Sequence, residues 1–223
     1  MIKQLGKLTR SEVFDIENAL VHLETVSGGI TVRESEDGKC HIQFFAKSEN
    51  GRTLADEAEI QATGKKIAIR VRWKETGFKR FFNGFSEGVN IVLELPRSAA
   101  LSIKAVSADI EIESALTSID VNSVSGDISV LQNPTSTCAL KTVSGDITTH
   151  TFSACYYTLR SLSGDIKVHV APGLDIDVDG KSLSGDTESE ISLSSNSNNS
   201  DADAERVMIS ATTVSGDIKL ARN

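Results

Sequence analysis

The hydrophobic pattern of the C-terminal half alternates between apolar and polar residues on both sides of a short Ser-Gly-Asp motif. Apolar residues recur one and three places after the aspartate, as in Ile128 and Val130, and eight and six places before it, as in Ile119 and Val121. Period-two alternation with β-branched residues is typical of half-buried strands, and the intervening glycine marks a bend. Each motif therefore predicts one strand–bend–strand unit.

The motif recurs at a nearly constant interval. Six copies, at residues 106–109, 124–127, 143–146, 162–165, 183–186 and 214–217, have serine spacings of 18, 19, 19, 21 and 31, and a seventh copy lies at 26–29. One unit cannot bury its own apolar face, but copies stacked in parallel about 4.8 Å apart would share a continuous core. The repeat predicts an all-β fold, a single-stranded β-helix or β-solenoid with coils of about 18–21 residues. The alternative is that the motif closes hairpins, which would give an antiparallel meander or sandwich.

The intervals that break the period predict the domain organisation. Residues 1–100 form an N-terminal β part, with a first coil at 21–33 and an antiparallel insertion at 34–95 that contains strand-like runs and a short helix within 53–60. Residues 101–223 form the solenoid repeats, continuous with the first part in one domain. The polar tract at 189–205 has too little apolar surface to offset its ordering entropy, so it predicts a flexible loop.

The repeated motif is interpreted as structural rather than catalytic. A serine nucleophile requires a base within hydrogen-bond reach, and the four histidines do not recur with the serines. Glycine permits a sharp bend, while serine and aspartate side chains can bond nearby backbone groups. Ala108 replaces glycine in one copy, which suggests that the bend does not strictly demand a positive φ. The predicted structural corners are Ser125, Gly126, Asp127, Ser144, Gly145, Asp146, Ser163, Gly164, Asp165, Ser184, Gly185, Asp186, Ser215, Gly216 and Asp217.

Stacking would place the repeat aspartates in one column, where like charges about 5 Å apart repel by about 1 kcal/mol in water. Backbone hydrogen bonds could offset this repulsion, and so could a bridging divalent cation. Calcium takes six to eight oxygen ligands, of which one aspartate per coil supplies few. His150 and His169, one period apart, would stack on one outer face, but two imidazoles without a third ligand make a weak metal site. No metal and no cofactor is predicted.

The segment at 73–85 is the least repeat-like part of the chain. It contains the single tryptophan and four of the eight phenylalanines beside basic residues. Such a loop could dock on an anionic membrane surface or insert into a partner, whereas the alternative is that its aromatic residues cap the open end of the core. The candidate interaction residues are Trp73, Lys74, Phe78, Lys79, Arg80, Phe81, Phe82 and Phe85.

Composition and hydropathy limit the kinds of partner and the cellular compartment that we expect for the protein. A formal net charge of −8 argues against nucleic acid, which requires a basic face. The chain has no apolar run of about 20 residues and no apolar signal core near its start, so we expect a cytoplasmic protein. The three cysteines show no CxxC spacing and are interpreted as buried free thiols.

The chain resembles the bacterial putative-adhesin family of unknown function, whose members repeat SGDI-like β units. The resemblance rests on residues 26–32, on the apolar run VNIVLELP at 89–96 and on the copies from residue 106 onward. It covers most of the chain and implies a right-handed β-helical fold.

Two functions from different classes follow. The first is a non-enzymatic interaction or scaffold module that binds a protein partner, including one at a membrane surface, as a monomer. The alternative is a structural or adhesive protein that polymerises end to end or binds a surface ligand, since exposed strand edges invite pairing. A carbohydrate-active enzyme is a weaker third option, because Asp120, Asp177, Asp179 and Glu188 are available but no pair stands out.

Overall fold

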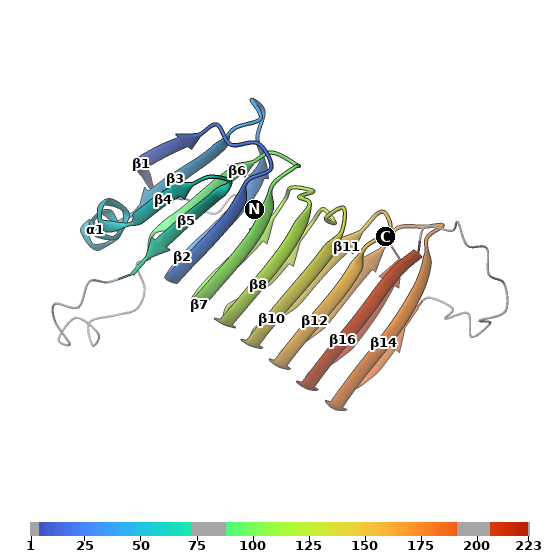
Figure 1. Ribbon diagram of the computed structural model, residues 1–223. Coiled ribbons are helices and arrows are strands. Elements are labelled where there is room, and N and C mark those ends of the chain that lie inside the picture. The colour runs from blue at the N-terminus through green and yellow to red at the C-terminus, as the bar shows by residue number, and fades with distance from the viewer. Residues whose placement is uncertain (1–4, 73–87, 191–205, 223) are drawn as a thin grey trace.

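The computed structural model describes residues 5–72, 88–190 and 206–222. The chain is wound into a stack of parallel β-coils, with antiparallel strands and one helix at the N-terminal end (Figure 1). The predicted β-solenoid is therefore confirmed. Successive repeats pair in parallel, which rules out a hairpin meander for the repeat region.

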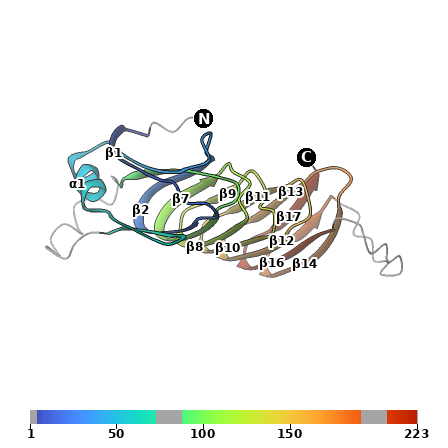
Figure 2. The same cartoon turned by 45° about the horizontal axis from the view of Figure 1, so that its top comes forward.

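Each repeat coil consists of a longer strand before the motif and a shorter strand after it. The coils are β8 (Ser118–Ser125) with β9 (Ile128–Val130), β10 (Thr137–Ser144) with β11 (Ile147–Thr151), β12 (Tyr156–Ser163) with β13 (Ile166–Val170), β14 (Asp175–Ser184) with β15 (Thr187–Ser189), and β16 (Arg206–Ser215) with β17 (Ile218–Arg222). In β2 (Leu20–Glu34) and β7 (Ala100–Ile112), one strand runs through the motif. Long strands pair with long strands and short with short, so the coils form two layers (Figure 2).

The core lies between these layers and is built from the columns that the alternation predicts. Leu140 pairs with Leu159, and Ile147 pairs with Ile166; all four side chains are fully buried. Burying one such side chain contributes about 1.5–3 kcal/mol, so the stacked columns supply most of the stability of the solenoid. The predicted inward positions on both sides of the motif are confirmed.

The N-terminal end contains elements that the repeat pattern does not contain. They are β1 (Lys7–Phe14), β3 (Cys40–Ala46), α1 (Glu49–Glu57), β4 (Glu59–Thr63), β5 (Lys66–Val71) and β6 (Asn90–Leu95). Strand β3 is antiparallel to β1 and β6, and β4 is antiparallel to β5. Helix α1 starts earlier than predicted because the hydroxyl of Ser48 caps it, accepting the Gly51 N–H at 3.1 Å.

The insertion predicted to be antiparallel also supplies a coil of the solenoid. Strands β5 and β6 pair in parallel with the two halves of β2. Ile67 lies opposite Val21, and Ile91 lies opposite Ile30, so the same inward columns continue into this coil. The antiparallel pairing predicted over 34–95 is therefore present between β3 and β6 and between β4 and β5, but the other edges of β5 and β6 are parallel to β2.

The last two coils are stacked in the reverse of their chain order. Strand β16 pairs with β12 on one side and with β14 on the other, so the C-terminal coil lies between its two predecessors (Figure 1). The inward residues of β16, Val207, Ile209 and Ala211, are fully buried, whereas β14 has Gly180 opposite Ala211. The coil with the better apolar face thus occupies the inner position.

Two predicted loops fall largely outside the described residues. The interaction segment at 73–85 lies outside them, as do residues 191–205 of the predicted flexible loop. The first two residues of that loop belong to the solenoid instead: Ser189 ends β15, and the Glu190 N–H donates to the Leu220 carbonyl at 3.0 Å.

Candidate functional site

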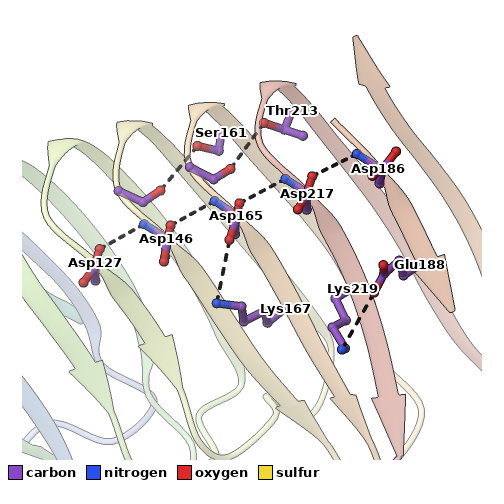
Figure 3. A network of polar contacts seen from close by, with 12 residues as sticks. Asp127, Asp146, Ser161, Asp165, Lys167, Asp186, Glu188, Thr213, Asp217 and Lys219 are labelled. Atoms are coloured by element: carbon purple, nitrogen blue, oxygen red, sulfur yellow. Dashed lines mark hydrogen bonds and ion pairs between the residues drawn. The ribbon is translucent and has the colours of Figure 1, made fainter. Parts of the chain in front are cut away.

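The repeat aspartates form one column along the corners, and each carboxylate accepts a hydrogen bond from the next coil. The Asp146 N–H donates to Asp127 Oδ1 at 2.9 Å, and the Asp165 N–H donates to Asp146 Oδ1 at 2.9 Å (Figure 3). The column then follows the stacking order, with Asp217 donating to Asp165 at 3.0 Å and Asp186 donating to Asp217 at 2.9 Å. These bonds offset the like-charge repulsion that the stacking imposes.

The surroundings of the column are those of a scaffold. Lys167 Nζ lies 3.8 Å from Asp165 Oδ2, which adds a positive charge beside the carboxylates. Across the described ranges there is no group of three or more His, Cys, Asp or Glu side chains that could hold a metal ion. Backbone N–H groups of adjacent coils therefore stabilise the carboxylates of the column, as one of the two arrangements considered from the sequence expects.

A second set of hydrogen bonds stabilises the inner side of three corners. The hydroxyl four places before the aspartate donates to the glycine carbonyl of the neighbouring coil, from Ser161 to Gly145 at 3.4 Å and from Thr213 to Gly164 at 3.3 Å (Figure 3). Ser182 donates to Gly216 in the same way at 2.9 Å. Ser161 and Thr213 are buried. Sequence reasoning missed this column, although a serine or threonine stands at the same place in consecutive copies.

The glycines of the corners are required both by conformation and by space. Gly145 and Gly164 have φ of 150° and 151°, where other residues are strained. A Cβ on Gly164 would lie 2.1 Å from the carbonyl oxygen of Gly145. Ala108 is accommodated because β7 runs through its motif without a positive φ. The tolerance inferred from Ala108 therefore does not extend to the bent corners.

Changes at Asp165 should separate a structural column from an ion site. Asp165→Ala removes the acceptor of the Asp217 N–H and should lower the free energy of unfolding by about 1 kcal/mol or less, since the site is partly exposed. Asp165→Asn keeps an acceptor oxygen and removes one negative charge, so it should leave the stability nearly unchanged. Urea unfolding with calcium and with chelator measures both. A calcium-dependent rise in wild-type stability that Asp165→Asn abolishes would show that the column holds a cation.

The outer face of the long strands carries an apolar column that the core does not use. The residue three places before each aspartate points outward, which gives an aliphatic ladder of Val106, Val124, Val143, Leu162, Val214 and Leu183. All but Leu183 are between 40 and 50% exposed, because each is covered in part by the residues above and below it.

A row of basic residues runs beside the aliphatic ladder. It lies two residues earlier on the same strands, about 7 Å away, and consists of Lys104, Lys141, Arg160 and Lys181, with Arg70 on β5 extending it at the N-terminal end. The register joins these residues through Glu24, Asn122 and Thr212 into one row. Lys104, Lys141 and Arg160 form no ion pair with any residue in the described part of the chain.

The basic row begins in a shallow depression of about 230 Å³ at the N-terminal end of this face. Arg70, Arg72 and Lys104 line it together with Val26 and Val106. Its one carboxylate, Glu24, has a lowered pKa, chiefly because His22 hydrogen-bonds to it at 3.0 Å and secondarily because of the nearby cations. The depression therefore combines an apolar lining with an excess of positive charge.

The other predicted residues do not converge into a site. His150 and His169 stack as predicted, with ring centroids 4.6 Å apart and planes at 15°. Of the carboxylates considered for glycoside chemistry, Asp177 and Asp179 lie two residues apart on the outward face of β14, and the others lie apart from them. Asp120 on β8 and Asp179 on β14 are separated by three strands, and Glu188 lies on the other layer.

The three cysteines are buried free thiols, as predicted. Burial raises the pKa of Cys40 and of Cys155 to about 11 and raises the pKa of Cys138 strongly. The thiolate form is therefore disfavoured, and these side chains act as small apolar residues.

Comparison with known proteins identifies relatives by sequence and by fold. The sequence model of the family described as Toastrack DUF4097 matches residues 21–223. No curated protein matches the chain. A putative cell adhesion protein from Clostridium sporogenes has a similar structure, with a TM-score of 0.59 and 10% identity over 97% of this chain and 100% of that chain. A putative adhesin from Bacteroides fragilis gives a TM-score of 0.49 and 13% identity over 96% and 97%. At 10% identity the likeness to the Clostridium sporogenes protein shows the fold alone. No helix within the described ranges is long and apolar enough to cross a membrane.

Proposed function

The chain belongs to the Toastrack DUF4097 family, and we propose that it is a non-enzymatic interaction module that binds a protein partner through the outer face of its long strands. The observation that carries this proposal is the aliphatic ladder beside the basic row. The Clostridium sporogenes protein of similar fold is described as a putative cell adhesion protein, which agrees in kind with a binding module.

The chemistry of the face indicates the kind of partner. Soluble proteins rarely expose a contiguous apolar patch, and those that do commonly use it for binding. Lys141 and Arg160 are adjacent on paired strands, exposed, and without a carboxylate partner among the described residues. In a chain of net charge −8, this local positive charge favours a partner surface that is both acidic and apolar.

The environment of the carboxylates supports a role without catalysis. Asp165, Asp217 and Glu188 line one shallow depression of about 210 Å³. Asp165 and Asp217 accept backbone N–H groups there, and Lys167 and Lys219 lie beside the carboxylates. General acid and base chemistry requires two such groups directed at one reacting bond. The repeated serine lacks a histidine within its corner, so nucleophilic chemistry has no support either.

Capture of cross-linked partners from cells of the source organism tests the proposal. The variant Lys141→Glu with Arg160→Glu reverses the adjacent charges of the basic row and should lose the partner that the wild type retains. The matched control is Lys167→Glu with Lys219→Glu, an adjacent basic pair on the opposite layer, which should retain it. Partner loss in the control alone, or in neither variant, would contradict the proposal.

A second part of the same experiment distinguishes binding to a membrane surface from binding to a protein partner. Anionic phospholipid headgroups would also match apolar and basic rows. Vesicles of phosphatidylserine and phosphatidylcholine should not sediment with the wild-type protein at physiological salt, because the face includes Glu24, Asp120 and Asp179. Sedimentation that the Lys141→Glu and Arg160→Glu changes abolish would replace the protein partner with a lipid surface.

A further inference from the structure

The terminal coil, formed by β14 and β15, has a neighbouring coil on its inner side only, among the described residues. No strand within the described ranges pairs with the outer edge of β14. Leu183 is 83% exposed, about twice the exposure of the other members of the aliphatic ladder. Ile176 and Val178 are only partly buried, whereas Val207 and Ile209, their counterparts on β16, are buried. This coil is thus an open end.

The opposite end of the stack is covered. Strand β4 lies along β5, and β3 lies along β6 with β1 beyond it, so the first coil has no open parallel edge. A register shift between Leu8 and Arg10 interrupts the outermost strand, β1, which is a common protection of sheet edges. Parallel head-to-tail stacking of copies therefore lacks a second competent end, whereas two open ends can meet each other.

We propose that β14 pairs antiparallel with β14 of a second copy, forming a closed two-fold dimer. In such an isologous interface both copies contribute the same surface, so that surface must be complementary to itself. The Met208 N–H donates to the Cys155 carbonyl before β12 at 3.1 Å, so the next residue, Ile209, directs its backbone groups toward β14. Ile209 lies opposite Val178 in the parallel register, so its backbone partners on β14 are Asp177 and Asp179. The even-numbered residues of this part of β14, including Val178 and Gly180, direct their backbone groups toward the open edge.

The charges of β14 select one register. With Gly180 on the two-fold axis, Asp179 of each copy lies opposite Lys181 of the other, which gives two cross-strand pairs of opposite charge. If the axis moves by one residue, to Asp179, the two copies of Asp179 lie opposite each other. If it moves by one more residue, to Val178, Asp177 lies opposite Asp179. Only the first of these three registers avoids placing like charges opposite each other. In that register Leu183 is covered by the opposing strand.

Charge variants test the dimer by sedimentation equilibrium. The wild type should be a dimer, and Lys181→Glu should raise the dissociation constant by about tenfold or more, because two attractive pairs become repulsive. The swapped variant Asp179→Lys with Lys181→Glu should restore the dimer. Both positions are exposed, so the changes leave the fold intact. A monomeric wild type up to about 100 µM, open-ended filaments, or a swap that fails to rescue Lys181→Glu would overturn the proposal.

A cysteine at the axis tests the register independently. In the proposed register Gly180 lies in a hydrogen-bonded pair, where Cα atoms are about 5.5 Å apart, within the range of a disulfide. A Cβ at Gly180 meets its nearest atom, Thr187 Cγ2, at 3.5 Å, so cysteine fits there. Mild oxidation of Gly180→Cys should give a covalent dimer, whereas Thr158→Cys on the internal strand β12 should not. Equal cross-linking of the two variants would contradict the assigned contact.

Discussion

Replacing Gly164 with alanine should lower the free energy of unfolding by about 3 kcal/mol or more. Two effects add at this position. The φ of 151° strains any residue with a Cβ, and that Cβ would lie 2.1 Å from the Gly145 carbonyl oxygen. The coils would have to separate locally, which breaks the hydrogen bonds of the corner on both sides. Urea unfolding followed by circular dichroism measures the change.

Gly173→Ala provides the matched control. Gly173 also has a positive φ, 85°, but a Cβ there meets nothing within 4 Å. Its replacement should therefore cost only about 1 kcal/mol, which reflects backbone conformation alone. Equal losses at the two glycines would mean that close stacking of the corners contributes nothing, contrary to the parallel register of the coils.

The reversed order of the last two coils should be visible in hydrogen exchange. Ile209 on β16 and Val178 on β14 lie opposite each other in the same column. Ile209→Ala should lower the stability by about 2–4 kcal/mol and increase amide exchange in both β16 and β14, because β14 has no other described neighbour. Val178→Ala, at a partly exposed position, should cost about 1 kcal/mol and increase exchange in β14 only.

The two variants together distinguish the stacking orders. If the coils followed chain order, β14 would be internal and β16 terminal, so the asymmetry would be reversed. Faster exchange in β16 after Val178→Ala, with β14 protected after Ile209→Ala, would contradict the observed order.

The alternation of apolar residues was sufficient to predict the parallel coils. Ile166 and Val168 follow their motif as Ile147 and Thr149 follow theirs, and the same rows meet in the structure. The structural role of the corners was also predicted from the recurrence of the motif, because a catalytic constellation has no reason to recur in every coil. Their satisfaction by backbone N–H groups required coordinates, since a carboxylate column can be stabilised in more than one way.

The reversed order of the last two coils could not be predicted because all copies carry the same Ser-Gly-Asp corner, which forms the same backbone hydrogen bonds with any other copy. Ser163 can pair with Ser184 or with Ser215 at equal backbone cost, so the motif leaves the order undetermined. The choice depends on the remaining apolar face, where Gly180 weakens one coil. The coil formed by β5 and β6 was missed for the opposite reason, because it lacks the motif and its two strands are far apart in the sequence.

The proposed binding face could not be recognised in the sequence because its residues are about one coil period apart in the chain. Val143 and Leu162 are visible as repeated letters, but only their outward parity shows that they lie outside the core. Lys141 and Arg160 are 19 residues apart in the chain and become neighbours through the coil period. The sequence analysis instead selected the aromatic segment at 73–85, which lies outside the described residues and stays a prediction.

One capture experiment tests most directly the central claim that the corners are scaffold and the outer face binds. Cells of the source organism would provide partners for three proteins side by side: wild type, Asp165→Asn, and Lys141→Glu with Arg160→Glu. The account predicts that Asp165→Asn retains the wild-type partner and that the double variant loses it, with all three proteins folded by circular dichroism. Loss of the partner in Asp165→Asn with retention in the double variant would contradict the account and place the site at the corners.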